Sequence, residues 1–320
     1  MQNDLYCTPT IRQHKDIERK MKLQITLTLI FTTLFFNNVH AITPEATTCN
    51  QALAKGDVTA ALAQANTILK RNKNDKDALL CQGRALSTSG NLDAALAAFK
   101  LADAQSSDAF DQTIVALLTG HAYKAAKQYE SAIVSYQQTI THAQAAKNKA
   151  FEFIAQNAIG DVAAETKQYP LALAAYLAGN KLAGNDNERG ENCENIAFTY
   201  HRMNQHDLAL EYQLKAYLMH DTVGTLDQYA HSSIELGRYY ALTKNYVSAE
   251  NVLNKIIKFA KDQGGAYYEA QASYVLAKVK VATGDIAAAR TLIEYARTIA
   301  KNTNDNALAE EINQEAMGLL

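Results

Sequence analysis

The sequence has 320 residues, of which 48% are hydrophobic and 20% charged, with a formal net charge of −2 and an isoelectric point near 6.5. This composition is that of an ordinary soluble globular chain and argues against a disordered or fibrous one. A nearly neutral chain has no field that attracts a phosphate backbone, so we expect no nucleic-acid partner. Prolines are few, and period-two alternation of apolar residues is scarce. We therefore expect an almost entirely α-helical fold.

Residues 1–41 have the pattern of a secretion signal. Lys20 and Lys22 precede an apolar stretch at residues 23–36. Those 14 residues are enough for the core of a signal peptide and too few for the roughly 20 that a membrane-spanning helix needs. The small residues Val39 and Ala41 have the spacing of a cleavage site, so we expect cleavage after Ala41.

The polar residues 1–20 would make this signal unusually long, and our hypothesis is that Met21 is the true start. An uncleaved membrane anchor is the alternative interpretation. Cleavage predicts an exported protein, periplasmic or secreted, with no stable membrane span.

Two series of small residues run through the remainder of the chain in step. One consists of Cys49, Gly83, Gly120, Gly160, Ala197, Gly237 and Ala277; the other consists of Ala61, Ala95, Ala132, Ala172, Ala209, Ala249 and Ala289. Both series advance by 34, 37, 40, 37, 40 and 40 residues, and periods of this length indicate a helix–turn–helix repeat. Small side chains let two antiparallel helices approach closely, so we expect Gly or Ala to face its counterpart across each pair. The polar segment 183–190 is expected to be a loop, either an ordinary connection or a hinge.

The segment from Gly83 to Ala95 resembles a tetratricopeptide repeat, with a small residue in the first helix, a Gly-Asn turn and an alanine in the second helix. The resemblance covers residues 42–303. It implies an all-α, right-handed superhelical solenoid of about seven helix pairs whose first helices line a concave groove. The longer units resemble those of kinesin light chains. Residues 304–320 are expected to form a C-terminal capping helix that shields the last pair.

Three cysteines follow the predicted signal. Cys49 and Cys81 belong to first helices of consecutive units, and an oxidising compartment would allow them to form a disulfide. Because Cys81 lies two residues before the place that matches Cys49, two buried free thiols are the alternative; a bridge needs Cα atoms within about 7 Å. Cys193 is expected to be a small buried packing residue.

No chemistry-bearing motif accompanies the repeats. The chain has no GxxxxGK, no HExxH and no CxxC spacing. No set of residues combines a nucleophile, a base and an orienting group. We therefore expect a protein that is not an enzyme and that holds no metal or cofactor.

The resemblance implies that the second, fifth, ninth and twelfth places of each first helix face the groove. The residues at these places are Arg84, His121, Lys124, Asn157, Asp161, Glu194, Phe198, His201, His231, Ile234, Arg238, Tyr274 and Lys278. Asn195 occupies a neighbouring place where the family often carries an asparagine that binds a peptide backbone. The clamp for chaperone tails found in some relatives needs a lysine where this chain has Ala46, so we do not expect that function.

The mixture of basic, acidic, amide and aromatic groups suits an extended or helical peptide. The leading hypothesis is an exported scaffold or adaptor that binds a protein or peptide partner through the groove. The alternatives are an extracytoplasmic protein that binds a peptide or a cell-wall polymer, a simple wetted surface, and self-association through residues 303–320. An enzyme resembling the helical superhelix of lytic transglycosylases would need a separate catalytic domain, for which the repeats leave no length.

Overall fold

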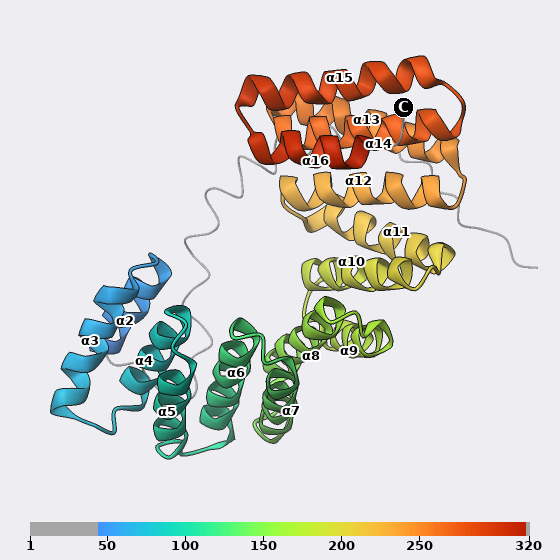
Figure 1. The fold of residues 1–320 in the computed structure, drawn as a ribbon. Helices are drawn as coiled ribbons and strands as arrows, with labels where there is room; N and C mark the ends of the chain where they lie inside the picture. Colours follow the sequence, from blue (N-terminus) through green and yellow to red (C-terminus); the bar gives the residue numbers. More distant parts are fainter. Residues whose placement is uncertain (1–43, 318–320) are drawn as a thin grey trace, which may run out of the picture. The chain divides into compact units, whose positions relative to one another are not determined.

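A computed structural model describes residues 44–317 (Figure 1). Every regular element in this range is a helix, and from α3 onward each helix packs against the next one along the chain. The helices are α2 (Pro44–Ala54), α3 (Val58–Arg71), α4 (Lys76–Thr88), α5 (Leu92–Asp103), α6 (Ala109–Ala125), α7 (Tyr129–Ala145), α8 (Lys149–Glu165), α9 (Tyr169–Leu182), α10 (Asp186–Arg202), α11 (His206–Val223), α12 (Leu226–Leu242), α13 (Tyr246–Gln263), α14 (Ala266–Ala282), α15 (Ile286–Thr303) and α16 (Asn306–Ala316). The all-α solenoid of seven helix pairs and a last capping helix is confirmed.

The even-numbered helices from α2 to α14 are the first helices of the seven pairs, and the odd-numbered helices are the second ones. The predicted signal, its cleavage after Ala41 and the alternative of a membrane anchor lie outside the described residues. Within residues 44–317, no helix combines the length and the apolar character needed to cross a membrane.

The turns inside the pairs combine a left-handed residue with a capping side chain. Gly56 and Gly284 have φ of 76° and 85°, and the next residue then caps the second helix. In the last pair, Asp285 Oδ1 accepts a hydrogen bond from the backbone N–H of Ala288 at 3.1 Å. Such a cap satisfies one of the donors that a helix start leaves free. Other pairs make the same left-handed turn without glycine, for example at Lys167, where φ is 61°.

In the four first helices whose small residue is glycine (Gly83, Gly120, Gly160 and Gly237), it makes room for a large side chain of the second helix. A Cβ atom added to Gly83 would lie 2.4 Å from the ring of Phe99, and one added to Gly120 would lie 2.5 Å from the ring of Tyr136. The expectation that Gly or Ala faces a small counterpart is therefore wrong. The glycine faces a bulky residue 16 places later, because a missing side chain on one helix lets a flat ring on the other approach the backbone.

The alanine series of the second helices is buried as expected. Its members Ala61, Ala95, Ala132, Ala172, Ala209, Ala249 and Ala289 each have 0% exposure. Methyl groups at these places let neighbouring helices pack closely without a void.

The interior of the fifth pair, α10 and α11, is unusually polar. Asn192 and His220 are almost fully buried, and Gln213 is buried with its amide donating to the Ser232 carbonyl at 3.1 Å. Gly190 leaves space for the imidazole of His220, because a Cβ atom there would lie 2.5 Å from Nε2. Amide and imidazole groups therefore share this interior with apolar side chains such as Ile196 and Tyr200.

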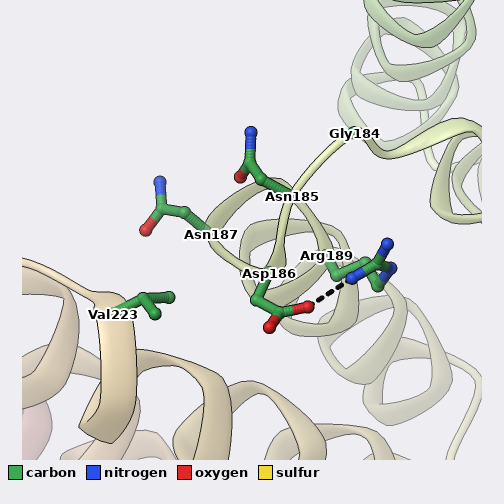
Figure 2. A pocket seen from close by; sticks show the side chains of 6 residues that line it. All are labelled: Gly184, Asn185, Asp186, Asn187, Arg189 and Val223. Atoms are coloured by element: carbon green, nitrogen blue, oxygen red, sulfur yellow. Dashed lines mark hydrogen bonds and ion pairs between the residues drawn. The ribbon is translucent and has the colours of Figure 1, made fainter.

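The predicted loop at residues 183–190 is mostly helical. Helix α10 begins at Asp186 because Asn185 Oδ1 accepts from the backbone N–H of Glu188 at 2.9 Å, which caps the helix. An open hollow lies at this helix start, lined by Gly184, Asn185, Asp186, Asn187, Arg189 and Val223 (Figure 2). The guanidinium of Arg189, which lines this hollow, already forms an ion pair with the carboxylate of Asp186.

The last five helices, α12–α16, share the largest hydrophobic cluster described. It includes the fully buried side chains of Ile234, Leu253, Ile256, Ile293 and Ile312. Smaller clusters occupy the earlier pairs. Apolar burial is therefore concentrated toward the C-terminal end of the array.

Candidate binding face of the first helices

One residue of each first helix stands directly after its small packing residue, and we call these residues the inner row. The inner row consists of Asn50, Arg84, His121, Asp161, Phe198, Arg238 and Lys278. Because the small residue faces the second helix of its own pair, its successor lies about 100° round the helix and points away from that contact. From Arg84 to Phe198 the inner row is exposed, whereas Arg238 and Lys278 are half-buried.

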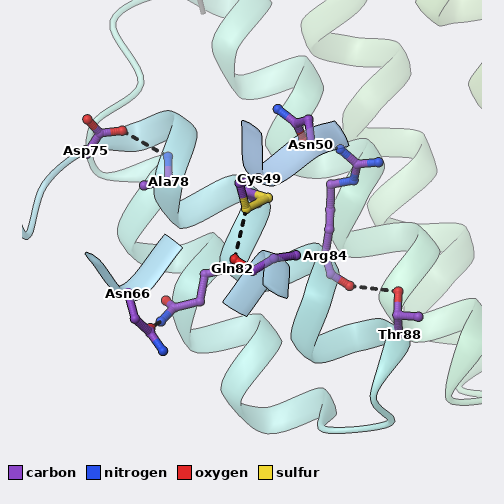
Figure 3. The surroundings of a disulfide bond; sticks show 10 residues. Cys49, Asn50, Asn66, Asp75, Ala78, Gln82, Arg84 and Thr88 are labelled. Atoms are coloured by element: carbon purple, nitrogen blue, oxygen red, sulfur yellow. Dashed lines mark hydrogen bonds between the residues drawn. A yellow bond between two sulfur atoms is a disulfide. The ribbon is translucent and has the colours of Figure 1, made fainter. Parts of the chain in front are cut away.

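At the N-terminal end, the inner row lies beside a disulfide. The structure joins Cys49 of α2 to Cys81 of α4, with Cα atoms 6.3 Å apart, within the range that a disulfide needs (Figure 3). Next to the bridge, Arg84 Nη1 donates to Asn50 Oδ1 at 2.6 Å. These two contacts link the first helices of the first two pairs. Cys193 is buried, and burial raises the pKa of its thiol to about 11.

In the middle of the array, the predicted groove residues bind one another. Lys124 Nζ of α6 lies 3.3 Å from Asp161 Oδ2 of α8. The other carboxylate oxygen of Asp161 accepts from the Tyr176 hydroxyl at 2.9 Å. His121 Nδ1 lies 3.0 Å from the Tyr136 hydroxyl. Three of the four polar residues expected to contact a ligand here are therefore held in fixed positions by neighbours of the same array.

Phe198 is the apolar member of the inner row. Its side chain is 44% exposed on α10. The guanidinium of Arg202 lies 5.8 Å from the centre of its ring and 5.4 Å from that of Tyr169, distances at which a cation and an aromatic ring attract. Phe198, Arg202 and Tyr169 form what we call the aromatic patch, in which Phe198 is exposed, Tyr169 is half-buried and the guanidinium lies beside both rings.

At the C-terminal end, α16 covers the inner row. Glu311 accepts hydrogen bonds from the hydroxyl of Tyr274 and from Nε2 of Gln271, the latter at 3.2 Å. One turn later, Glu315 contacts Lys278 Nζ and lies 3.7 Å from Arg238 Nη1. Tyr274 is only 2% exposed. The expectation that Tyr274 lines an open groove is therefore wrong, because α16 lies over it.

The charged groups at this end stabilise one another. Burial alone would lower the pKa of Arg238, but Glu235, Tyr274 and Glu315 raise it above its ordinary value. Burial and the hydrogen bond to Glu311 raise the pKa of Tyr274. Arg238 is thus a fixed cation, and Tyr274 is a fixed hydroxyl donor at neutral pH.

Some predicted groove residues point into the array. Asn157 is half-buried, and its Oδ1 would lie 2.8 Å from a Cβ atom on Gly179. Glu194 Oε1 is buried 3.4 Å from Nδ1 of His220. Ile234 is fully buried. For these three the groove assignment is wrong, because the atoms that would meet a ligand are buried inside the array.

The remaining predicted residues stay on accessible surface. His231 is exposed. His201 and Asn195 are half-exposed, and His201 Nδ1 lies 3.3 Å from Nδ1 of His206 across the turn of the fifth pair.

The sequence analysis missed Glu311 and Glu315 as members of the inner face. The repeat spacing carried this signal, because both residues stand 37 places after Tyr274 and Lys278. It also missed Arg202 and Tyr169, which come from the two sides of an inter-pair connection and cannot be paired by spacing. Within residues 44–317, no group of three or more His, Cys, Asp and Glu side chains has the geometry to hold a metal ion.

Family models support the repeat assignment. Residues 50–110 and residues 191–262 each match a model described as tetratricopeptide repeat. These two segments of the chain are therefore similar in sequence to tetratricopeptide repeats. No curated protein matches its sequence.

Solved structures share the fold of this repeat protein. The apo form of RapI superposes with a TM-score of 0.68 at 14% identity, covering 86% of this chain and 81% of RapI. Aspartyl phosphate phosphatase F from Bacillus subtilis gives 0.60 at 11% identity, covering 89% and 82%. A signal-transduction ATPase with a tetratricopeptide repeat sensor, PH0952 from Pyrococcus horikoshii, gives 0.63 at 15% identity, covering 87% of this chain and 44% of the ATPase. At such identities the likeness establishes the fold alone.

Proposed function

We propose that this repeat protein is an exported scaffold or adaptor that binds a protein or peptide partner through its inner row, and that it catalyses no reaction. One observation carries the proposal. Between Arg84 and Phe198 the first helices present an exposed row of basic, acidic and aromatic side chains, most of them already held in place.

Pre-positioned side chains favour binding because less side-chain entropy is lost when a partner docks. An exposed aromatic ring beside a guanidinium has the composition of a binding hot spot. The aromatic patch is therefore the proposed centre of the binding surface, and Arg84, His121, Lys124 and Asp161 extend it toward the N-terminal end.

Site-specific cross-linking tests the surface. A photoreactive phenylalanine analogue replaces Phe198 in one variant. In the matched control it replaces Val247, an apolar residue of α13 that is 74% exposed and lies outside the inner row. After irradiation of producing cells, we expect discrete cross-linked products from position 198 and none of the same mass from position 247. Identical products from both positions, or none from position 198, would contradict the proposal.

Affinity gives a second readout once a partner is captured. Phe198→Asp should weaken its binding at least tenfold, whereas Val247→Asp should leave it unchanged. Loss of a buried aromatic contact commonly costs 2 kcal/mol or more, which is about thirtyfold in affinity.

An extracytoplasmic protein that binds a cell-wall polymer is the second candidate, favoured by the exposed ring of Phe198 and the half-buried ring of Tyr169. Co-sedimentation with insoluble cell-wall polymer separates the two. Sedimentation that depends on Phe198 would favour the polymer over a protein partner.

Export has its own test. N-terminal sequencing of the protein from the exported fraction should begin at Ile42 and read ITPEAT. A retained signal segment, or a protein found only inside the cell, would contradict export with cleavage.

A further inference from the structure

We propose that Arg238, Tyr274 and Lys278 form a binding site for an acidic amphipathic helix of a protein partner, and that α16 occupies this site in the free chain. This inference rests on the proposed function, because it assigns a partner chemistry to the C-terminal end of the same inner row.

The polar contacts of α16 define what the site recognises. Glu311 accepts from three donors of α14: the hydroxyls of Tyr267 and Tyr274 and the amide of Gln271. Glu315 contacts Lys278 and Arg238, which come from two successive first helices. The site therefore binds two carboxylates that are one helical turn apart. Neutral hydrogen-bond donors bind the first carboxylate, and two cations bind the second.

Apolar contacts set the orientation of the occupant. Leu308 and Ile312 are buried at 1% and 0% exposure in the cluster shared by α12–α16. Together with the carboxylates they give the pattern L-x-x-E-I-x-x-E, which places two apolar and two acidic side chains on adjoining stripes of one helix. A partner helix with this pattern would satisfy the same groups.

The opposite face of α16 makes few contacts with the array. Glu310, Asn313 and Gln314 are exposed, and Met317 at its end is 80% exposed. The helix is 11 residues long and fully buries only two side chains. It follows α15 through Asn304, which has a left-handed backbone, and Asp305. Because α16 packs mainly against α15 and α14 among the described helices, its departure would leave the contacts between the seven helix pairs in place.

Charge decides which partner fits. Arg238 keeps one carboxylate of its own, with Nε 3.1 Å from Glu235 Oε1. Lys278 forms no ion pair other than the one with Glu315 in the described part of the chain. Removing α16 therefore exposes uncompensated positive charge, which favours an acidic helix and disfavours a basic one. Since a tethered helix has an effective concentration of order millimolar, a partner must bind more tightly than α16 to replace it.

A peptide-binding experiment on the full chain tests the inference. The probe is a fluorescent peptide with the sequence of residues 306–316, measured by fluorescence anisotropy. In the first variant, Glu311→Gln and Glu315→Gln weaken the tethered occupant. In the second variant, Leu308→Asp and Ile312→Asp remove the apolar side chains by which α16 packs against the array. We expect the probe to bind at least one variant ten times more tightly than the unaltered chain, with circular dichroism showing that the repeats stay folded.

Two controls define the specificity. A probe with Gln in place of both contacting glutamates should bind at least tenfold more weakly, and Arg238→Glu added to either variant should abolish binding. Equal binding to all chains, or binding that ignores the two glutamates, would overturn the inference. Dimerisation of the variants through exchanged α16 helices, seen by analytical ultracentrifugation without any binding of the probe, would overturn it in favour of a second copy as occupant.

This experiment fails independently of the proposed function. If the probe does not bind but position 198 still yields discrete cross-linked products, the scaffold proposal stands and only the assignment of this end is lost. If the probe binds and position 198 gives no products, the acidic-helix site stands alone.

Discussion

Gly160 of α8 lies against the ring of Tyr176 in α9, and a Cβ atom added to the glycine would be 2.5 Å from Cε1 of that ring. Gly160→Ala should therefore destabilise the protein by about 1–3 kcal/mol through overpacking. Thermal and urea unfolding followed by circular dichroism measure the change. Gly184→Ala is the matched control and should be nearly neutral, because its added Cβ would make only one ordinary contact, at 3.5 Å. Equal stability of both variants would contradict the packing described for the pairs.

The disulfide between Cys49 and Cys81 closes a loop with a sequence separation of 32. Replacing both by serine should cost about 3–4 kcal/mol on the chain-entropy estimate, and the loss should be confined to the first two pairs. Hydrogen exchange of α2–α4 measures it. Thiol titration of the denatured, unreduced exported form should find one free thiol, that of Cys193. Three free thiols would rule the bridge out.

Asp111 at the start of α6 binds Lys76 at the start of α4, with Oδ1 and Nζ 2.5 Å apart. Burial raises the pKa of Asp111, but hydrogen bonds from Lys76 and Ser107 outweigh it and leave this pKa below its ordinary value. A lowered folded-state pKa means that the contribution to stability is present above the unfolded value of about 4 and is lost as the pH falls through the folded value.

Asp111→Asn should consequently lower the melting temperature at pH 7 and make it less sensitive to acid as the pH falls below about 4. Asp103→Asn, at an exposed carboxylate of α5, serves as the control and should keep the acid sensitivity of the unaltered chain. An Asp111→Asn variant that melts like this control at every pH would argue against the ion pair.

Lys167 occupies the left-handed turn between α8 and α9, with φ of 61°. Because glycine adopts this conformation without steric cost, Lys167→Gly should raise stability by a few tenths to about 1 kcal/mol. Lys181→Gly, within α9, should instead lower it by about 1 kcal/mol. The two midpoints of urea unfolding should move in opposite directions; movement in the same direction would show that the turn is not strained.

The repeat landmarks were sufficient to predict the helix pairs, because a small first-helix residue and a second-helix alanine recur at matched increments. The exposed part of the inner row, from Arg84 to Phe198, followed from the same register. The side chains that pack against the small residues could not be predicted from this register. Gly160 and Tyr176 lie on different helices, and their contact depends on how the two helices cross, which spacing alone does not fix.

Tyr274, Asn157 and Glu194 were misplaced for a related reason. The rule for groove positions considers one helix at a time, whereas burial depends on the neighbours. Tyr274 is covered by α16, Asn157 Oδ1 turns toward the space that Gly179 leaves in α9, and Glu194 Oε1 is buried beside His220 of α11. Predicting the burial of these three side chains would have required knowledge of the contacts between successive helix pairs.

The large hydrophobic cluster of α12–α16 also has a consequence for the order of folding. In a linear array each unit gains stability only from its neighbours, so the segment with the most apolar burial is the first to hold together. Here that segment is synthesised last, and the polar fifth pair separates it from the earlier units. We therefore expect α12–α16 to be the first helices to become protected when the full chain refolds, and the earlier helices to follow.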